Sequence, residues 1–245
     1  MGDNMDRTAA MALLTCSIPP SITEDELAAW MARSQASNIP VTWIVRDQML
    51  PLTAQAAKRT GFETPPSLAL DLSQNKPNSR QQLRCVITKN RSVWPFLESV
   101  VLYGSDSIRH RDTLVEEGIK TIAVDYFDDT HQVTRRPAPP GWPCRSILWG
   151  LWELALHSNN HHSFLGTLHR FMHPSLHRGL LIRRVDSAGQ RESLLSIRKR
   201  YDKNLRWAHR QSQNSKITFI SLCDLPIVLQ QSSSSALKGS ILRAA

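Results

Sequence analysis

The stretch MALLTCSIPPSITEDELAAWMARSQASNIPVTWIV, residues 11 to 45, decides the fold class of this chain. Its two ends, Met11 to Cys16 and Val41 to Val45, are short apolar runs typical of buried strands. Between them, Thr23 and Glu26 have the spacing of a helix capping box, and apolar residues then recur on one helical face. A strand, a helix and a strand joined by short links form a right-handed parallel crossover. We therefore expect an α/β fold, with a parallel sheet and helices outside it.

The alternation of helix and strand continues along the chain. The pattern predicts helices at residues 50–59, 80–89, 108–117, 163–172 and 192–210, and a short last helix opened by Ser221 and Asp224. It predicts further strands at residues 67–72, 100–103, 119–124, 147–154, 179–185 and 217–220. These elements predict one domain over residues 1–231, with loops or insertions at 129–146 and 155–163. Residues 232–245 are expected to be a disordered tail.

The composition bounds the compartment and the class of partner. The four cysteines have no close pair, which excludes a zinc knuckle and a CxxC redox motif. We find no secretory signal and no apolar stretch of about 18 residues, so we expect a cytoplasmic protein without a membrane partner. The net charge of +9 favours anionic partners, although charge of this kind more often only keeps a protein soluble. From composition alone, nucleic acid is therefore a less favoured partner. The composition does not determine the oligomeric state.

The opening stretch resembles the start of the polysaccharide deacetylase (chitooligosaccharide deacetylase homology) family. The segments LLTCSIPPS and NIPVTWIV, separated by a helix, follow that layout, and GIKTIAVD at residues 118–125 is also similar. The resemblance implies a distorted, TIM-like (β/α) barrel of the glycoside hydrolase/deacetylase type. The family's first strand ends in Thr-Phe-Asp-Asp-Gly-Pro, whose aspartates act as base and metal ligand. Here TCSIPP, residues 15–20, occupies those places and lacks both acids.

The later family motifs are also incomplete. The family places two metal-binding histidines after its third strand, but residues 70–79 contain none. Its late Leu-x-His motif, which supplies the catalytic acid, meets Leu181, Ile182 and Arg183, and Asp125 with Tyr126 only partly matches a supporting Asp-Trp element. The resemblance therefore implies a divergent member without metal or cofactor and without metal-dependent deacetylase activity.

The functional face of a (β/α) barrel is the ring of C-terminal strand ends, because the loops there vary without disturbing the packed strands. Carboxylates and guanidinium groups at this ring would suit a hydroxyl-rich ligand, and a tryptophan ring can stack on a sugar. The predicted catalytic residues are Asp71, Asp125 and Glu153. The predicted ligand-binding residues are Ser17, Asp47, Trp152, Arg183 and Arg184.

These residues leave several functions open. The first is a carbohydrate-binding or scaffolding relative of the deacetylases. The second is a metal-independent carbohydrate-active hydrolase that uses two of the strand-end carboxylates. The third is a binder of anionic polymers through the basic helix at residues 198–210. A rival metal site from the histidines between residues 157 and 177 is less favoured, because no acid accompanies them at HExxH spacing.

Overall fold

The computed structural model describes residues 10–71, 80–103, 110–125, 144–148, 150–156, 181–185, 192–214 and 217–230. In chain order the elements are β1 (Ala10–Ser17), α1 (Glu24–Ala36), β2 (Val41–Arg46), the short 3₁₀ helix η1 (Asp47–Met49), α2 (Leu50–Thr60), β3 (Ser67–Asp71), α3 (Arg80–Val93), β4 (Ser99–Tyr103), α4 (Arg111–Glu116), β5 (Thr121–Asp125), β6 (Cys144–Leu148), β7 (Leu151–Ala155), β8 (Leu181–Val185), α6 (Leu194–Gln213) and β9 (Ile217–Ile220). Residues 225–230 are also helical.

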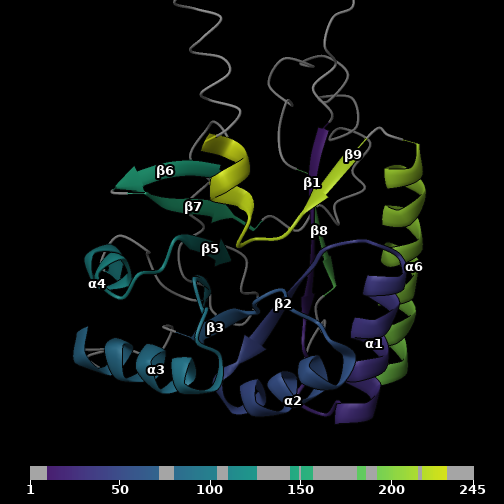
Figure 1. The fold of residues 1–245 in the computed structure, drawn as a ribbon, viewed down its shortest axis with the longest axis horizontal. Helices are drawn as coiled ribbons and strands as arrows, with labels where there is room; N and C mark the ends of the chain where they lie inside the picture. Colours follow the sequence, from purple (N-terminus) through teal and green to yellow (C-terminus); the bar gives the residue numbers. More distant parts are fainter. Residues whose placement is uncertain are drawn as a thin grey trace, which may run out of the picture.

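The strands form one curled sheet in the order β6-β7-β5-β4-β3-β2-β1-β8, and β9 pairs with the first half of β1. All of these pairings are parallel except β6 with β7. From β1 to β5 each new strand lies beside the previous one, as successive crossovers of one hand require. The result is a half-barrel with helices around its outside (Figure 1), which confirms the predicted α/β barrel class.

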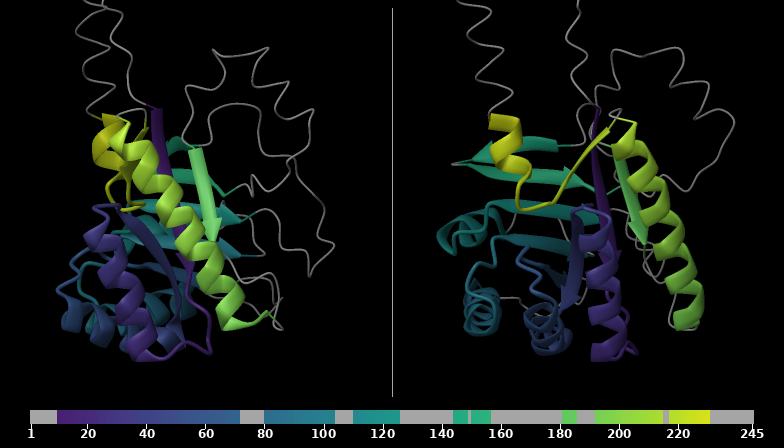
Figure 2. Two further views of the ribbon diagram at one scale, coloured as in Figure 1. Left: turned by 90° about the vertical axis from the view of Figure 1, so that its right-hand side faces the viewer. Right: turned by 45° about the vertical axis from the view of Figure 1, so that its right-hand side comes forward.

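The outer face of the sheet packs against the helices. Alternate residues of β1 and β2, such as Leu14 and Trp43, are fully buried in one cluster with the inner sides of α1, α2 and α6. Tyr201 of α6 stacks on Trp30 of α1 with ring centroids 5.1 Å apart, and its hydroxyl donates a hydrogen bond of 2.8 Å to the Trp30 carbonyl oxygen. This contact joins α1 and α6, which lie side by side over β1 and β8 (Figure 2).

The inner face of the sheet packs against the segment that follows β9. Leu13 of β1 and Val101 of β4 lie in one buried cluster with Leu222, Leu225 and Leu229 from the segment that follows β9. The backbone N–H of Leu222 also donates a hydrogen bond of 2.9 Å to the buried Thr42 hydroxyl. The segment that follows β9 therefore packs into the inner face of the half-barrel.

One predicted strand is wrong. Residues 147–154, expected as a single strand, are divided between β6 and β7, which form an antiparallel pair. Gly150, between them, has φ +83°, a backbone conformation open to glycine that lets the chain reverse. Residues 144–146, expected in the preceding loop, begin β6.

The predicted caps agree with the structure, whereas the helices predicted at 80–89 and 192–210 extend to Val93 and Gln213. Thr23 and Glu26 form the capping box of α1, and Gly61 and Gly118 have the left-handed backbone that follows a helix. The predicted helix at 163–172, the histidines at 157–177, most of the 129–146 loop and the tail at 232–245 lie outside the described residues. Within the described part of the chain, no helix is long and apolar enough to cross a membrane.

Candidate functional site

Three polar residues end three neighbouring strands at one level of the sheet. Asp71 of β3 is the register partner of Tyr103 of β4, and Tyr103 is the partner of Asp125 of β5. Adjacent strands lie about 4.8 Å apart, so the backbones of the two aspartates are roughly 10 Å apart with the tyrosine between them. Asp71 is exposed, and Tyr103 packs partly against the inner cluster. We call these three residues the strand-end row.

The end of β1 lies beside this region, across β2. Ser17 pairs with Ile44 of β2 and is half-buried. Thr15, two residues earlier, is fully buried, and its hydroxyl has no hydrogen-bond partner among the described residues. Cys16 and Ile18 belong to the buried cluster under the helices, so they take no part in the inner face. Ser17 therefore belongs to the inner side of β1, at the register level of Ser67 and four residues before the level of Asp71.

The two adjacent arginines of β8 have different surroundings, because neighbours on a strand face opposite sides. The Arg183 guanidinium lies 3.8 Å from the ring centroid of Trp207 and donates a 3.1 Å hydrogen bond to Asn204, both on α6. Burial there lowers the pKa of Arg183. Arg184 pairs with Thr15 of β1 and donates to the Leu156 carbonyl oxygen at 3.4 Å. The structure therefore places Arg183 under α6 and only Arg184 on the inner side.

The structure does not bring Glu153 together with Asp71 and Asp125. Glu153 is only 4% exposed. Its carboxylate forms an ion pair with Arg111 at the start of α4, with Oε2 3.1 Å from the arginine Nη2. It follows Trp152, whose neighbours are the inner cluster, so Glu153 belongs to the outer face. This contact fastens α4 to β7.

Trp152 is also distant from the strand-end row. It is the register partner of Thr121, the first residue of β5, whereas Asp125 is the last. Four residues of strand separate those levels by roughly 13 Å. The Trp152 ring is half-buried against the inner cluster. The tryptophan therefore belongs to the packed interior near the opposite end of β5.

Two other predicted polar residues stabilise local structure. Asp47, at the start of η1, forms an ion pair with Lys89 of α3, with Oδ2 3.0 Å from the lysine Nζ. Ser221 is buried and accepts a 3.3 Å hydrogen bond from the Asp224 N–H, while its hydroxyl also donates to the Asp224 carboxylate. The second pair caps the helix at 225–230, as the sequence predicted.

Comparison with known proteins bears on the fold. A crystal structure from Mycobacterium smegmatis, named "putative polysaccharide deacetylase", superimposes with a TM-score of 0.51 at 12% sequence identity, covering 92% of this chain and 92% of that one. This chain has a deacetylase-like barrel fold. No protein-family model matches the sequence, and no curated protein matches it. Similarity at this level of identity shows the fold alone.

Among the described residues, the donor atoms at the strand ends do not fit the metal centre of the deacetylase family. The two aspartates of the family's first motif correspond to Ser17 and Ile18, and Ile18 is buried and has no donor atom. Among the described residues, no group of three His, Cys, Asp or Glu side chains is arranged to hold a metal ion. A divalent cation needs several such ligands, so no chemical step is assigned to a metal here.

A groove between α1 and α6 was not predicted as a site. It has a volume of about 640 Å³ and is lined by Arg33, Ala36, Ser37, Asp202, Leu205, Arg206, His209 and Arg210. His209 Nδ1 lies 3.1 Å from the Ser37 carbonyl oxygen and Arg33 Nη1 lies 2.8 Å from Asp202, so both helices form the walls. The basic residues of α6 were visible in the sequence, but the opposite wall comes from about 170 residues earlier.

Proposed function

We propose that this chain is a divergent polysaccharide deacetylase-like domain that binds carbohydrate at the ends of β3, β4 and β5 without metal-dependent deacetylation. The strand-end row carries the proposal. Two carboxylates offer hydrogen-bond acceptors to sugar hydroxyls, and the tyrosine between them offers an aromatic ring and a hydroxyl. Ser17 and Arg184 add a hydroxyl and a guanidinium on the β1 side of the same barrel.

A second candidate is a metal-independent carbohydrate-active hydrolase, which the spacing of Asp71 and Asp125 favours. Inverting glycosidases, which invert the configuration of the anomeric carbon, use two carboxyl groups about 6.5–9.5 Å apart. This separation leaves room for the attacking water. Backbones roughly 10 Å apart on β3 and β5 are compatible with that separation. One carboxylic acid would protonate the leaving oxygen while the other carboxylate accepts a proton from the water.

Isothermal titration calorimetry with hexamers of N-acetylglucosamine and of glucose tests the binding proposal. The double variant Asp71→Asn/Asp125→Asn is expected to weaken binding at least tenfold, because it removes charged acceptors. Glu98→Gln is the matched control, since that half-exposed acid precedes β4 at the opposite end of the strand. Wild-type protein that binds neither hexamer, or a double variant that binds as wild type does, contradicts the proposal.

The hydrolase alternative has a separate test. Wild-type protein would release new reducing ends from the same hexamers in the presence of a chelator, and Asp71→Asn and Asp125→Asn would each abolish the release. Binding without any release of reducing ends leaves the carbohydrate-binding proposal intact and removes the hydrolase.

A further inference from the structure

Helix α6 carries a straight row of exposed cations on its outer side. Lys199, Lys203, Arg206 and Arg210 follow one another at spacings of four, three and four residues, and all four are exposed. Residues at such spacings lie one above another on a helix. The row covers 12 residues, so its ends are 11 steps of 1.5 Å, or about 16 Å, apart. We call these four residues the α6 row.

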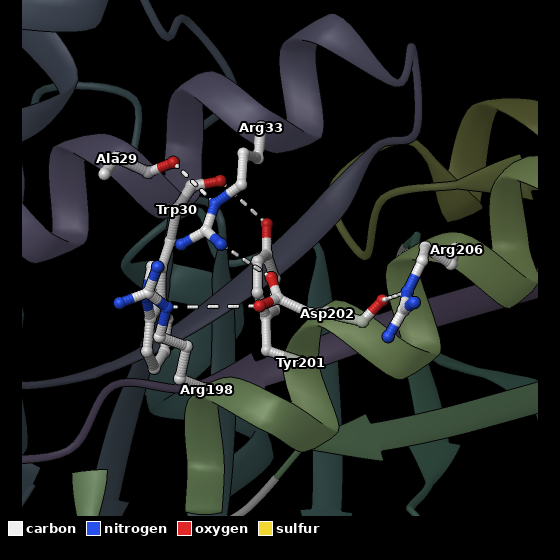
Figure 3. Close-up of polar contacts among 7 residues, drawn as sticks. All are labelled: Ala29, Trp30, Arg33, Arg198, Tyr201, Asp202 and Arg206. Carbon is white, nitrogen blue, oxygen red and sulfur yellow. Dashed lines mark hydrogen bonds and ion pairs between the residues drawn. The ribbon is translucent and has the colours of Figure 1, made fainter. Parts of the chain in front are cut away.

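Acids of the described residues do not neutralise the α6 row. Within the described residues, no carboxylate lies within ion-pair distance of any of its members, whereas many other exposed cations are paired, including Arg59, Arg84, Lys89 and Lys120. Arg206 donates its Nε hydrogen to the Asp202 main-chain oxygen at 3.2 Å, which holds its guanidinium along the helix (Figure 3). Lys203 lies nearly three turns before the C-terminal end of α6, and Lys199 lies further from it. A favourable interaction with the helix dipole is limited to the last turn, so it does not explain these two lysines.

Beside the row, at the groove between α1 and α6, two arginines share one carboxylate, which leaves an excess of positive charge. Arg33 lies on the α1 side of this groove, and Asp202, the acid of its lining, is already engaged by Arg33 at 2.8 Å and lies 4.0 Å from Arg198 (Figure 3). The exposed residues of α1 on this side include Ala29, Ala32 and Ala36, which are small and uncharged.

We propose that the α6 row and the α1–α6 groove bind the phosphate backbone of double-stranded nucleic acid without sequence specificity. A line of cations with no carboxylate partner among the described residues matches a line of phosphates, and arginine forks bind phosphate oxygens with two hydrogen bonds. A single strand would need exposed aromatic rings on which its bases stack. The aromatic ring of this helix nearest the row, Trp207, is packed against Phe219 and covered by Arg183. The geometry thus favours a duplex, and the proposal is independent of the carbohydrate site.

Fluorescence anisotropy tests the proposal with a labelled 20-base-pair DNA duplex of mixed sequence, a single strand of equal length, and polyglutamate as competitor. Four phosphate contacts predict a log–log salt slope near −3.6, so affinity is expected to fall roughly 100-fold between 50 and 200 mM salt. The test variant is K199Q/K203Q/R206Q/R210Q. The control K58Q/R80Q/K89Q/K120Q removes the same net charge from α2, α3 and the segment before β5, and circular dichroism checks that both variants fold.

The test variant is expected to bind the duplex at least 30-fold more weakly at 50 mM salt, with a slope close to zero. The control is expected to stay within about threefold of wild type, since its charges lie on other elements. Absence of duplex binding at 50 mM salt, or an equal loss in both variants, overturns the proposal. Tighter binding of the single strand, or displacement of the duplex by polyglutamate at equal charge concentration, overturns it as well.

Discussion

At the scale of single residues, Glu153 shows how burial changes the meaning of a carboxylate. It is 4% exposed, and its partner Arg111 is 16% exposed, so both ions are largely removed from water. A buried ion pair is weak evidence of net stabilisation, but removing one partner leaves an uncompensated buried charge. The structure therefore assigns Glu153 to the packing of α4 on β7.

Glu153→Gln is expected to lower the free energy of unfolding by about 3 kcal/mol, because Arg111 then stays buried without its counter-ion. Urea denaturation measures this, and Arg111→Met/Glu153→Leu is expected to recover most of the loss. The half-exposed pair of Glu98 and Lys120 is the control, since Glu98→Gln is expected to cost less than about 1 kcal/mol. If Glu153→Gln kept full stability but abolished hexamer binding, Glu153 would belong to the ligand site instead.

Tyr201 gives the folded state a dependence on alkaline pH. Burial of its hydroxyl raises the pKa of Tyr201 far above the ordinary value of 10.0. The unfolded chain therefore loses this proton at a lower pH than the folded chain does. Stability from this group is complete below about pH 10 and falls as the pH rises above it, because unfolding then releases a proton.

Above about pH 10.5, the free energy of unfolding of wild type is expected to fall by about 1.4 kcal/mol per pH unit more steeply than that of Tyr201→Phe. Parallel urea titrations of the two proteins measure the difference, since other ionising groups are common to both. Tyr201→Phe also loses the hydrogen bond to the Trp30 carbonyl oxygen, which shifts its stability by about 1 kcal/mol at every pH. Identical slopes for the two proteins would contradict the assignment.

At the scale of elements, the segment after β9 completes the interior of the half-barrel. Leu225 and Leu229 are buried among strand residues of the inner face, whereas Ile227 on the same helical turn is 56% exposed. Ser221 and Asp224 cap this helix, so its start was predictable from the sequence. Its packing against the inner face follows from long-range contacts.

Leu225→Ala and Leu229→Ala are each expected to cost about 2–4 kcal/mol of stability, since each leaves a cavity in the inner cluster. Ile227→Ala supplies the matched control on the same helix and is expected to change stability by less than about 0.5 kcal/mol. Thermal and urea unfolding measure all three variants. Equal, small effects at the three positions would show that the helix does not pack inside the barrel in solution.

At the scale of the whole molecule, the two proposed binding surfaces lie on different parts of the barrel. The strand-end row closes β3, β4 and β5, whereas the α6 row lies on the outer helix that covers β1 and β8 (Figures 1 and 2). The two surfaces share no residue. Ligands on them have no shared contacts through which to change one another's affinity.

Saturating hexamer is therefore expected to leave the duplex affinity of wild-type protein unchanged within about twofold. Anisotropy titrations with and without the hexamer measure this coupling directly. The α6-row variant serves as control, because it is expected to bind hexamer as wild type does. A strong reciprocal effect of the two ligands would mean that they share one surface or that the barrel changes conformation between them.

The sequence by itself determined what depends on local chemistry. Caps such as Thr23 with Glu26, the glycines at 61 and 118, and the apolar periods predicted most described helices and strands and therefore an α/β fold with a parallel sheet. The family resemblance, and not these local patterns, implied that the sheet forms a barrel. The sequence also predicted that Asp71 and Asp125 end strands, and parallel pairing does place them on one level. These features depend on neighbours within a few residues.

Only the tertiary structure decided which residues meet across the chain. Neighbours on a strand face opposite sides, so strand ends alone did not separate Arg183 from Arg184 or Glu153 from the inner face. The hairpin at Gly150 depends on pairing between β6 and β7, and the α1–α6 groove joins Arg33 to Asp202 across 169 residues. Such contacts follow from the folding of distant segments against each other, which local propensity and spacing do not encode.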